Sequence, residues 1–216
     1  MAIIETLVST GGEFQFTAKA FLQQQSFNNQ GVLQRTGLTL GAGYQGTEFQ
    51  YGIAADVTTK TPTDSAYEYL KGEEIVFRPY YGFWTDSFYL QLGISAGVDD
   101  VEDITYADGS LLPLNQNYTG LGVRTLWQIN KSHLLGGSVA FTQRNFKNAS
   151  LPTGAKRTDS EMQMQLKYSY YFLPKFSVNA TIEHISNSST LGEGDVRDKN
   201  YKVDNIGLGF IWDVFE

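Results

Sequence analysis

Apolar residues alternate with polar or small residues over long stretches of this chain, and this period of two constrains its fold more than any other feature. In residues 88–98 every even position is apolar, from Phe88 to Val98, whereas Gln91, Gly93 and Ser95 occupy odd positions. Successive side chains of a β-strand point to opposite faces, so such a segment forms a strand with one apolar and one polar face. No apolar run approaches the length of a membrane helix. The pattern predicts an all-β fold.

The same alternation recurs in about ten segments, which are long enough to cross a bilayer as tilted strands. They are residues 14–22, 38–44, 49–57, 75–83, 88–98, 121–129, 135–141, 162–172, 176–182 and 206–214. The segments follow one another along the whole chain and leave no room for a second domain. The sequence therefore predicts a single domain over residues 1–216.

Two folds fit alternating strands, and they differ in which face is hidden. A soluble sandwich or barrel buries its apolar face, whereas a membrane barrel turns that face toward lipid. Here aromatic residues gather near the segment ends, and the polar face is rich in glycine. Small glycines on an inner face leave volume for large inward side chains, which here are Arg35, Arg78, Arg124, Tyr80, Tyr89 and Tyr118. These features favour an antiparallel transmembrane up-and-down β-barrel of about ten strands.

The last segment resembles the C-terminal assembly signal of bacterial outer-membrane β-barrel proteins, in which a polar residue and a glycine precede two spaced aromatic residues. The matching residues are Asn205, Gly207, Phe210 and Trp212. The resemblance implies an integral protein of the Gram-negative outer membrane, surrounded by membrane lipids and lipopolysaccharide. It also implies the barrel-assembly machinery, and other proteins of the cell envelope, as partners.

Short and long connections alternate between the predicted strands. The short ones are residues 45–48, 85–87, 130–132 and 173–175, and the long polar ones are residues 59–72, 99–117, 147–159 and 187–200. One connection on the long side, residues 27–31, is short. Outer-membrane barrels have short periplasmic turns and long external loops. The arrangement therefore places both termini in the periplasm.

Charge and composition limit the partners and the cellular compartments that fit this chain. The net charge of −7 argues against binding to nucleic acid. The absence of cysteine fits an oxidising compartment without disulfides, and equally fits many cytosolic proteins. Residues 1–5 lack the basic and apolar regions of a signal peptide, so we expect a mature chain or a barrel cut from a longer protein.

One long connection contains an acidic run, formed by Asp99, Asp100, Glu102 and Asp103. Oxygen ligands of this kind suit Ca²⁺, and a solvated acidic loop is the other interpretation. Apart from calcium at Asp99–Asp103, the sequence predicts no metal and no cofactor.

The inward face of the predicted barrel mixes charges of both signs. It carries Glu13, Arg35, Asp56, Arg78, Arg124, Lys167 and Glu183. Opposite charges that face one another form ion pairs, and about ten strands enclose a lumen that side chains can fill. The sequence therefore predicts a filled or narrow lumen rather than a wide selective pore. A non-enzymatic role follows, as a porin-like channel in transport, an assembly or export component, or a surface-interaction protein.

A second functional hypothesis comes from residues 183–187, at the end of a predicted strand. His184 and Ser186 share the lipid-facing side of that strand, where a base and a nucleophile come close to hydrogen-bonding reach. The segment resembles the His-x-Ser-Asn motif of outer-membrane lipid A deacylases. The resemblance implies an ester hydrolase with Ser186 as nucleophile, His184 as base and Asp204 as orienting acid. It covers the last thirty or so residues, has Asp where the family has Glu, and those enzymes have eight strands.

The same region also resembles non-enzymatic barrels of polysaccharide and lipoprotein export machinery. Their last strands carry Ser-Asn-Ser, a polar loop and Tyr-x-x-Asn, which correspond here to residues 186–188 and to the stretch from Tyr201 to Asn205. This second resemblance implies no chemistry at these residues, so both hypotheses stay open.

Overall fold

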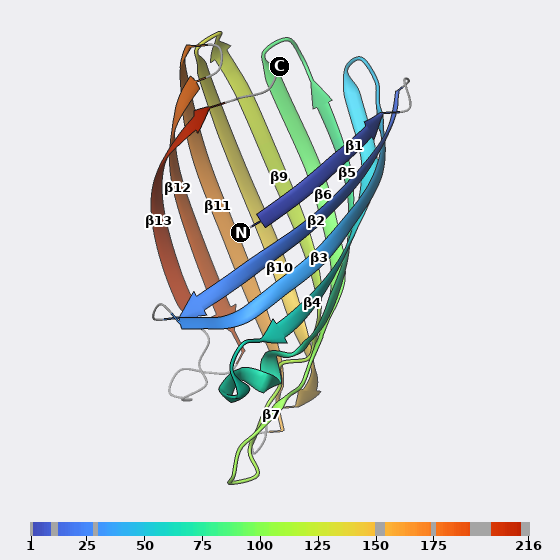
Figure 1. Cartoon of the computed structure of the whole chain (residues 1–216), viewed down its shortest axis with the longest axis vertical. Coiled ribbons are helices and arrows are strands. Elements are labelled where there is room, and N and C mark those ends of the chain that lie inside the picture. The colour runs from blue at the N-terminus through green and yellow to red at the C-terminus, as the bar shows by residue number, and fades with distance from the viewer. Residues whose placement is uncertain are drawn as a thin grey trace.

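A single antiparallel sheet forms the wall of the molecule (Figure 1). The computed structural model describes residues 2–9, 13–27, 30–149, 154–173, 176–190 and 200–212. Eleven strands are hydrogen-bonded in chain order. They are β1 (Ala2–Ser9), β2 (Phe14–Phe27), β3 (Gln30–Gln45), β4 (Phe49–Pro62), β5 (Gly72–Trp84), β6 (Phe88–Val101), β9 (Gln116–Asn130), β10 (His133–Ala149), β11 (Lys156–Leu173), β12 (Phe176–Ser189) and β13 (Tyr201–Trp212).

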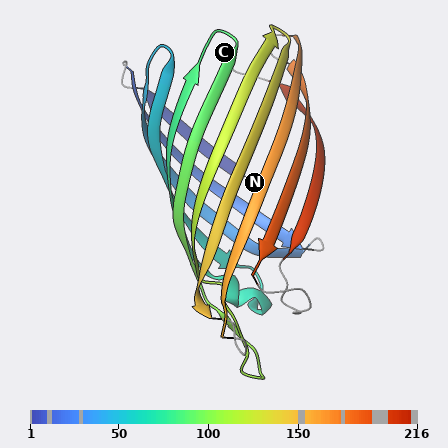
Figure 2. The ribbon, with the colours of Figure 1, turned by 180° about the vertical axis from the view of Figure 1, so that it is seen from behind.

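The sheet curves around a lumen, so its first strands lie opposite later strands across the interior. In Figure 1 the strands β1 to β4 cross in front of β9 to β12, and Figure 2 shows the same crossing from behind. Neighbouring strands of the sheet are antiparallel, and each strand lies next to the strand of the sheet that precedes it in the sequence. The predicted up-and-down sheet is therefore confirmed, and the described part of every predicted segment belongs to a strand of this wall.

The apolar side chains cover the outer face of the wall. Ile94 and Leu121 expose 59% and 57% of their surface, whereas Ser177 and Asn179 on the opposite parity are buried. A water-soluble fold hides residues such as Ile94. The exposure pattern thus matches a membrane barrel, and the predicted assignment of the two faces is confirmed.

Short turns gather at one end of the wall and long connections at the other (Figure 1). Residues 46–48, 85–87 and 131–132 form tight turns, whereas residues 174–175 of the fourth predicted turn lie outside the described part. The long-connection end carries the 3₁₀ helix η1 (Ser65–Leu70) and the small hairpin of β7 (Ile104–Thr105) and β8 (Leu111–Leu112). No helix in the described ranges is long and apolar enough to cross a membrane.

Aromatic rings cluster near the short-turn end, as predicted from the aromatic residues near the ends of the alternating segments. Tyr44 packs against Phe14, Phe49 and Tyr51 with ring centroids 5.4–5.7 Å apart. Such rings mark the membrane interface in barrels of this class. This end of the wall therefore has the character of an interfacial girdle.

The sheet of the described residues contains eleven strands where about ten were predicted, and it is not closed. The additional strand is β1, whose apolar residues come in adjacent pairs (Ile3 and Ile4, Leu7 and Val8) rather than in alternation. In the described residues β1 and β13 are not paired with each other. Since Ala2 lies opposite Leu22 of β2, β1 begins part-way along the wall, whereas β13 ends at Trp212 opposite Phe176 near the short-turn end.

Glycines on the inner face make room for tyrosines, as the composition predicted. Tyr118 leans from β9 against Gly97 of β6, and Tyr80 leans from β5 over Gly52 and Gly43. A β-carbon at Gly97 would lie 2.7 Å from the Tyr118 ring. Each tyrosine thus fills the space that a neighbouring glycine leaves.

Valine at Gly97 is expected to lower the free energy of unfolding by about 1–3 kcal/mol, because the added atoms overlap Tyr118 and the backbone oxygen of Ile75. Gly93 is the matched control on the same strand and face, since the nearest atom to a β-carbon there is 3.9 Å away. Denaturant unfolding in detergent micelles measures both variants. Equal losses in the two variants would show that the missing side chain at Gly97 is not what makes room for Tyr118.

Candidate functional site in the lumen

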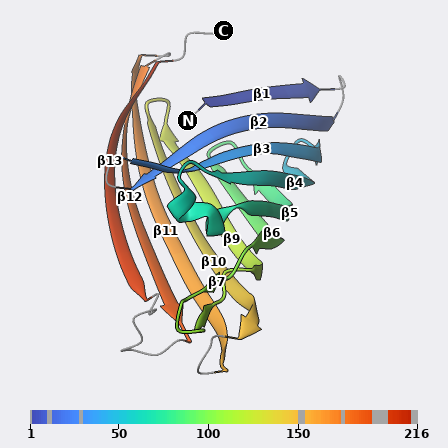
Figure 3. The ribbon, with the colours of Figure 1, turned by 60° about the horizontal axis from the view of Figure 1, so that its bottom comes forward.

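A polar chamber of about 580 Å³ lies inside the wall near the long-connection end. Strands β3 to β6 and β9 supply one side of it and strands β10 to β13 supply the other. Leu70, the last residue of η1, also lines it, and Figure 3 shows η1 lying across this end of the lumen. We call this space the loop-end chamber.

The first side of the loop-end chamber holds two acids and two bases that neutralise one another. Arg35 pairs with Glu74 at 2.6 Å, and Lys60 pairs with Asp99 at 2.6 Å. The Tyr118 hydroxyl donates a hydrogen bond of 2.9 Å to Glu74. Because Lys60 also lies 3.8 Å from Glu74, the four charges form one connected group.

The opposite side repeats this arrangement with different residues. Arg144 pairs with Glu161 at 3.0 Å, and the Tyr201 hydroxyl donates to Glu161 at 2.7 Å. Arg157 pairs with the buried Asp159 and stacks over the ring of Phe146, 4.2 Å from its centroid. Two self-neutralised groups therefore face each other across the chamber.

The residues that the sequence predicts for the lumen do not form one cluster in the structure. Arg78 pairs with Asp56, both from the predicted set, whereas Arg35 pairs with Glu74 instead. Glu183 accepts hydrogen bonds from Gln163 and from Asn205 of the assembly signal. Glu13 lies before β2 and accepts from Tyr44 at the girdle. Within the described ranges no ion pair involves Arg124 or Lys167.

Sequence reasoning missed most of the chamber. Its charged residues lie beyond the predicted strand ends, at Lys60, Glu74, Asp99, Arg144, Arg157, Asp159 and Glu161. The apolar alternation that marks a strand stops where the membrane-facing surface stops, but the strands continue past it. The alternation of charged residues at Arg157, Asp159 and Glu161 was the available signal.

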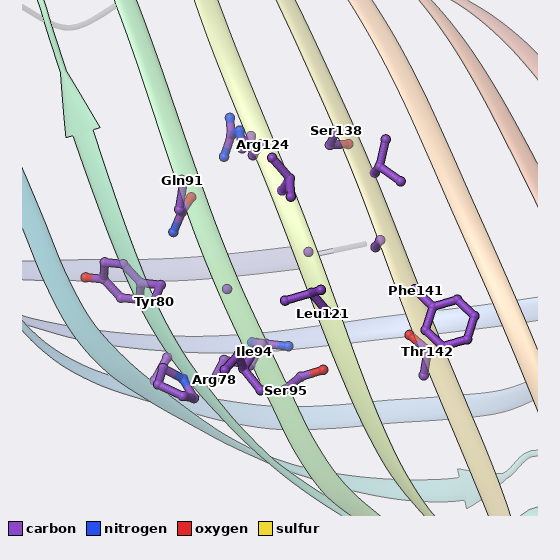
Figure 4. A pocket seen from close by; sticks show the side chains of 17 residues that line it. Arg78, Tyr80, Gln91, Ile94, Ser95, Leu121, Arg124, Ser138, Phe141 and Thr142 are labelled. Atoms are coloured by element: carbon purple, nitrogen blue, oxygen red, sulfur yellow. The ribbon is translucent and has the colours of Figure 1, made fainter.

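A second hollow of about 350 Å³ lies at mid-height (Figure 4). Three neighbouring strands, β6, β9 and β10, place their inward residues there in three parallel rows. The rows are Gln91, Arg124 and Ser138, then Gly93, Gly122 and Ala140, then Ser95, Gly120 and Thr142. Tyr80 and Arg78 of β5 lie on the side toward β4. We call this hollow the mid-lumen trough.

The residues of the esterase hypothesis lie on β12 and β13. His184 and Asp204 are opposite each other, and the His184 Nδ1 lies 2.7 Å from the Asp204 Oδ1. Ser186 lies opposite Lys202 and Met162, and no hydrogen bond joins it to His184 among the described residues. An apolar hollow of about 400 Å³ adjoins His184, with Met164, Leu166 and Ile182 in its wall.

The acidic run does not gather around one point. Asp99 pairs with Lys60 in the lumen, whereas Asp103 accepts hydrogen bonds from the backbone N–H groups of Leu114 and Asn115. Burial raises the pKa of the Asp103 carboxyl, but these bonds and one from Asn148 outweigh it and hold the pKa below its usual value. No group of three or more potential metal ligands occurs in the described ranges, and calcium at this loop stays a prediction.

The residues of the assembly signal lie on β13. Phe210 packs against Phe172 and Phe176, with ring centroids 6.2 and 5.8 Å away. Gly207 lies opposite Thr181 of β12, and the side chain of Trp212 lies outside the described part.

No family model matches the chain, and no curated protein matches its sequence. Solved structures match its fold. OmpT, an outer membrane protein of Vibrio cholerae, has a TM-score of 0.60 at 13% identity, over 97% of this chain and 63% of that chain. The toluene transporter TodX of Pseudomonas putida has a TM-score of 0.55 at 11% identity, over 87% of this chain and 72% of that chain. The NanC porin has a TM-score of 0.52 at 10% identity, over 98% and 99%.

These likenesses concern the fold, because the identities are low. The chain spans 63% of the length of OmpT. All three proteins are outer-membrane β-barrels, so the predicted resemblance to bacterial outer-membrane β-barrels is confirmed, and the predicted outer-membrane localisation is supported. No lipid A deacylase is among these three structures.

Proposed function

We propose that this chain is an integral outer-membrane β-barrel without enzymatic activity, whose narrow lumen is obstructed by ion pairs. The observation that carries this proposal is the loop-end chamber, where two neutralised groups of charges face each other beneath η1. Paired charges hold side chains in place and leave no field of one sign to attract ions. The barrel then serves as a narrow channel for selected solutes, or as an assembly, export or surface-interaction component.

We further propose that the wall closes in the membrane with both termini in the periplasm. A free edge exposes backbone groups that lipid cannot satisfy. β1 and β13 are the first and the eleventh strands of the sheet. Because neighbouring strands are antiparallel, these two strands run in the same direction. Bacterial barrels have an even number of strands. Closure therefore takes either direct pairing of β2 with β13, which gives the predicted ten strands, or a further strand between β1 and β13.

Planar-bilayer recordings of the purified protein are expected to show little or no steady current, because the charged groups fill the passage. Removing one ion pair with Arg35→Ala and Glu74→Ala together should raise the conductance without leaving a lone charge, since Lys60 keeps Asp99 as its partner. Lys71→Ala, outside the lumen lining, is the control. A large and stable current through the unaltered protein would contradict an obstructed lumen.

The hydrogen bond between His184 and Asp204 favours a second candidate function, hydrolysis of an ester of lipid A. An acid that holds the imidazole is the arrangement by which hydrolases orient their base. The apolar hollow beside His184 offers space for an acyl chain at the lipid-facing surface. Ser186 would have to turn toward His184 to act as the nucleophile.

If this second function holds, purified protein will release a fatty acid from lipid A, and Ser186→Ala will reduce the rate by several orders of magnitude. Asp204→Asn should cost less, because the acid orients the base and does not react. Ser188→Ala, on the same strand and face, is the control for folding. Mass spectrometry of lipid A that stays intact with the unaltered protein would remove this candidate.

A further inference from the structure

We propose that the mid-lumen trough binds a small organic monocarboxylate, with Arg124 as the residue that pairs with the carboxylate. This inference rests on the proposed function in one respect, namely that the wall is a membrane barrel whose inner face is in contact with water. It adds a site, a ligand class and the residues that select it.

The register of the strands builds the trough. Gln91, Arg124 and Ser138 form one row because each is the direct cross-strand neighbour of the next. The row of Ser95 and Thr142 lies four residues further along each strand, or roughly 13 Å away. Between them lies a floor of Gly93, Gly122 and Ala140. Polar rims on both sides of a small-residue floor leave a hollow with space for a bound molecule.

The charge of the trough selects a monoanion. Two charged residues line it, Arg78 and Arg124. Asp56 neutralises Arg78, whereas Arg124 forms no ion pair within the described ranges and lies between an amide and a hydroxyl. One positive charge therefore stays available. A guanidinium binds a carboxylate through two parallel hydrogen bonds, and Gln91 and Ser138 on either side are further donors.

The floor of the trough selects an organic body behind the carboxylate. Four inward glycines, Gly43, Gly52, Gly82 and Gly97, lie against a tyrosine. Gly93 and Gly122 do not, and a β-carbon at either would find no atom closer than 3.8 Å. The ring of Tyr80 forms one side of the uncovered floor. A volume of about 350 Å³ falls in the range of small-molecule sites. An apolar or aromatic group can thus lie on the glycines while the carboxylate meets Arg124 (Figure 4).

The test is calorimetric titration of the folded barrel in detergent with benzoate, and with benzyl alcohol as a neutral molecule of similar shape. Benzoate should bind with saturation and benzyl alcohol at least tenfold more weakly, because it lacks the charge. Arg124→Gln should weaken benzoate binding roughly tenfold or more. Gly122→Val should weaken it by filling the floor, with no loss of thermal stability.

Lys167→Gln is the matched control, since Lys167 is another inward cation without an ion pair in the described part of the chain and lies outside the trough. It should leave benzoate binding unchanged. Absence of benzoate binding, equal affinity in Arg124→Gln, or an equal loss in Lys167→Gln would each overturn the site. Conductance is read separately, so a current through a barrel that binds benzoate would contradict the obstructed lumen and leave the site in place.

Discussion

Replacing Leu166 by arginine is expected to lower the free energy of unfolding in lipid vesicles by about 2–4 kcal/mol. Leu166 lies near the middle of β11 and exposes 49% of its surface on the outer face. A guanidinium placed there meets hydrocarbon instead of water, and the cost is largest near the bilayer midplane. Reversible urea unfolding in vesicles measures the change.

Gln165→Arg is the control for Leu166→Arg, because the adjacent residue points into the lumen. Its cross-strand neighbour is Glu183, so a new guanidinium there gains a carboxylate partner. The loss in this variant should be much smaller. Losses of equal size would mean that the two faces of the wall are assigned the wrong way.

Replacing Lys60 by methionine is expected to cost about 3–5 kcal/mol of stability, which is typical of removing one partner from a buried ion pair. The side chains of Lys60 and Asp99 are each 11% exposed and lie 2.6 Å apart. Without Lys60, the Asp99 carboxylate keeps one weak contact from Gln116, at 3.3 Å. The double change of Lys60→Met with Asp99→Leu should recover most of the loss.

Lys71→Met is the matched control for Lys60→Met. Lys71 pairs with Glu68 at 3.5 Å, but both side chains are more than 60% exposed, and exposed pairs contribute little. Its variant should unfold like the unaltered protein. If Lys60→Met behaves in the same way, the loop-end chamber is not held by its ion pairs.

The faces of the wall could be predicted from the sequence because they depend on parity alone. Once residues 88–98 are assigned to a strand, alternate side chains must lie on the same face. The apolar face then contacts lipid, and the polar face contacts water. That inner glycines leave volume for large side chains such as Tyr118 was predictable in the same way, whereas the particular partner of Tyr118, Gly97, depends on the register of β6 and β9.

The partners inside the lumen could not be predicted, because they depend on register and on strand length. Arg35 meets Glu74 across a neighbouring strand, and the two lie 39 residues apart in the chain. A one-residue slip would have paired different groups. The predicted link between His184 and Asp204 is present in the structure because parity places both residues on the outer face and the register of β12 and β13 sets them opposite each other.

The most direct test of an inside-out wall is a single-cysteine scan along β6, which is unambiguous because the chain has no cysteine of its own. Spin labels at positions 91 to 96 would be examined in lipid vesicles for collision with oxygen, which concentrates in lipid, and with a water-soluble nickel chelate. Labels replacing Leu92, Ile94 and Ala96 are expected to favour oxygen, and those replacing Gln91, Gly93 and Ser95 to favour the chelate. A reversed pattern, or no alternation along β6, would contradict a membrane barrel with this orientation of its faces.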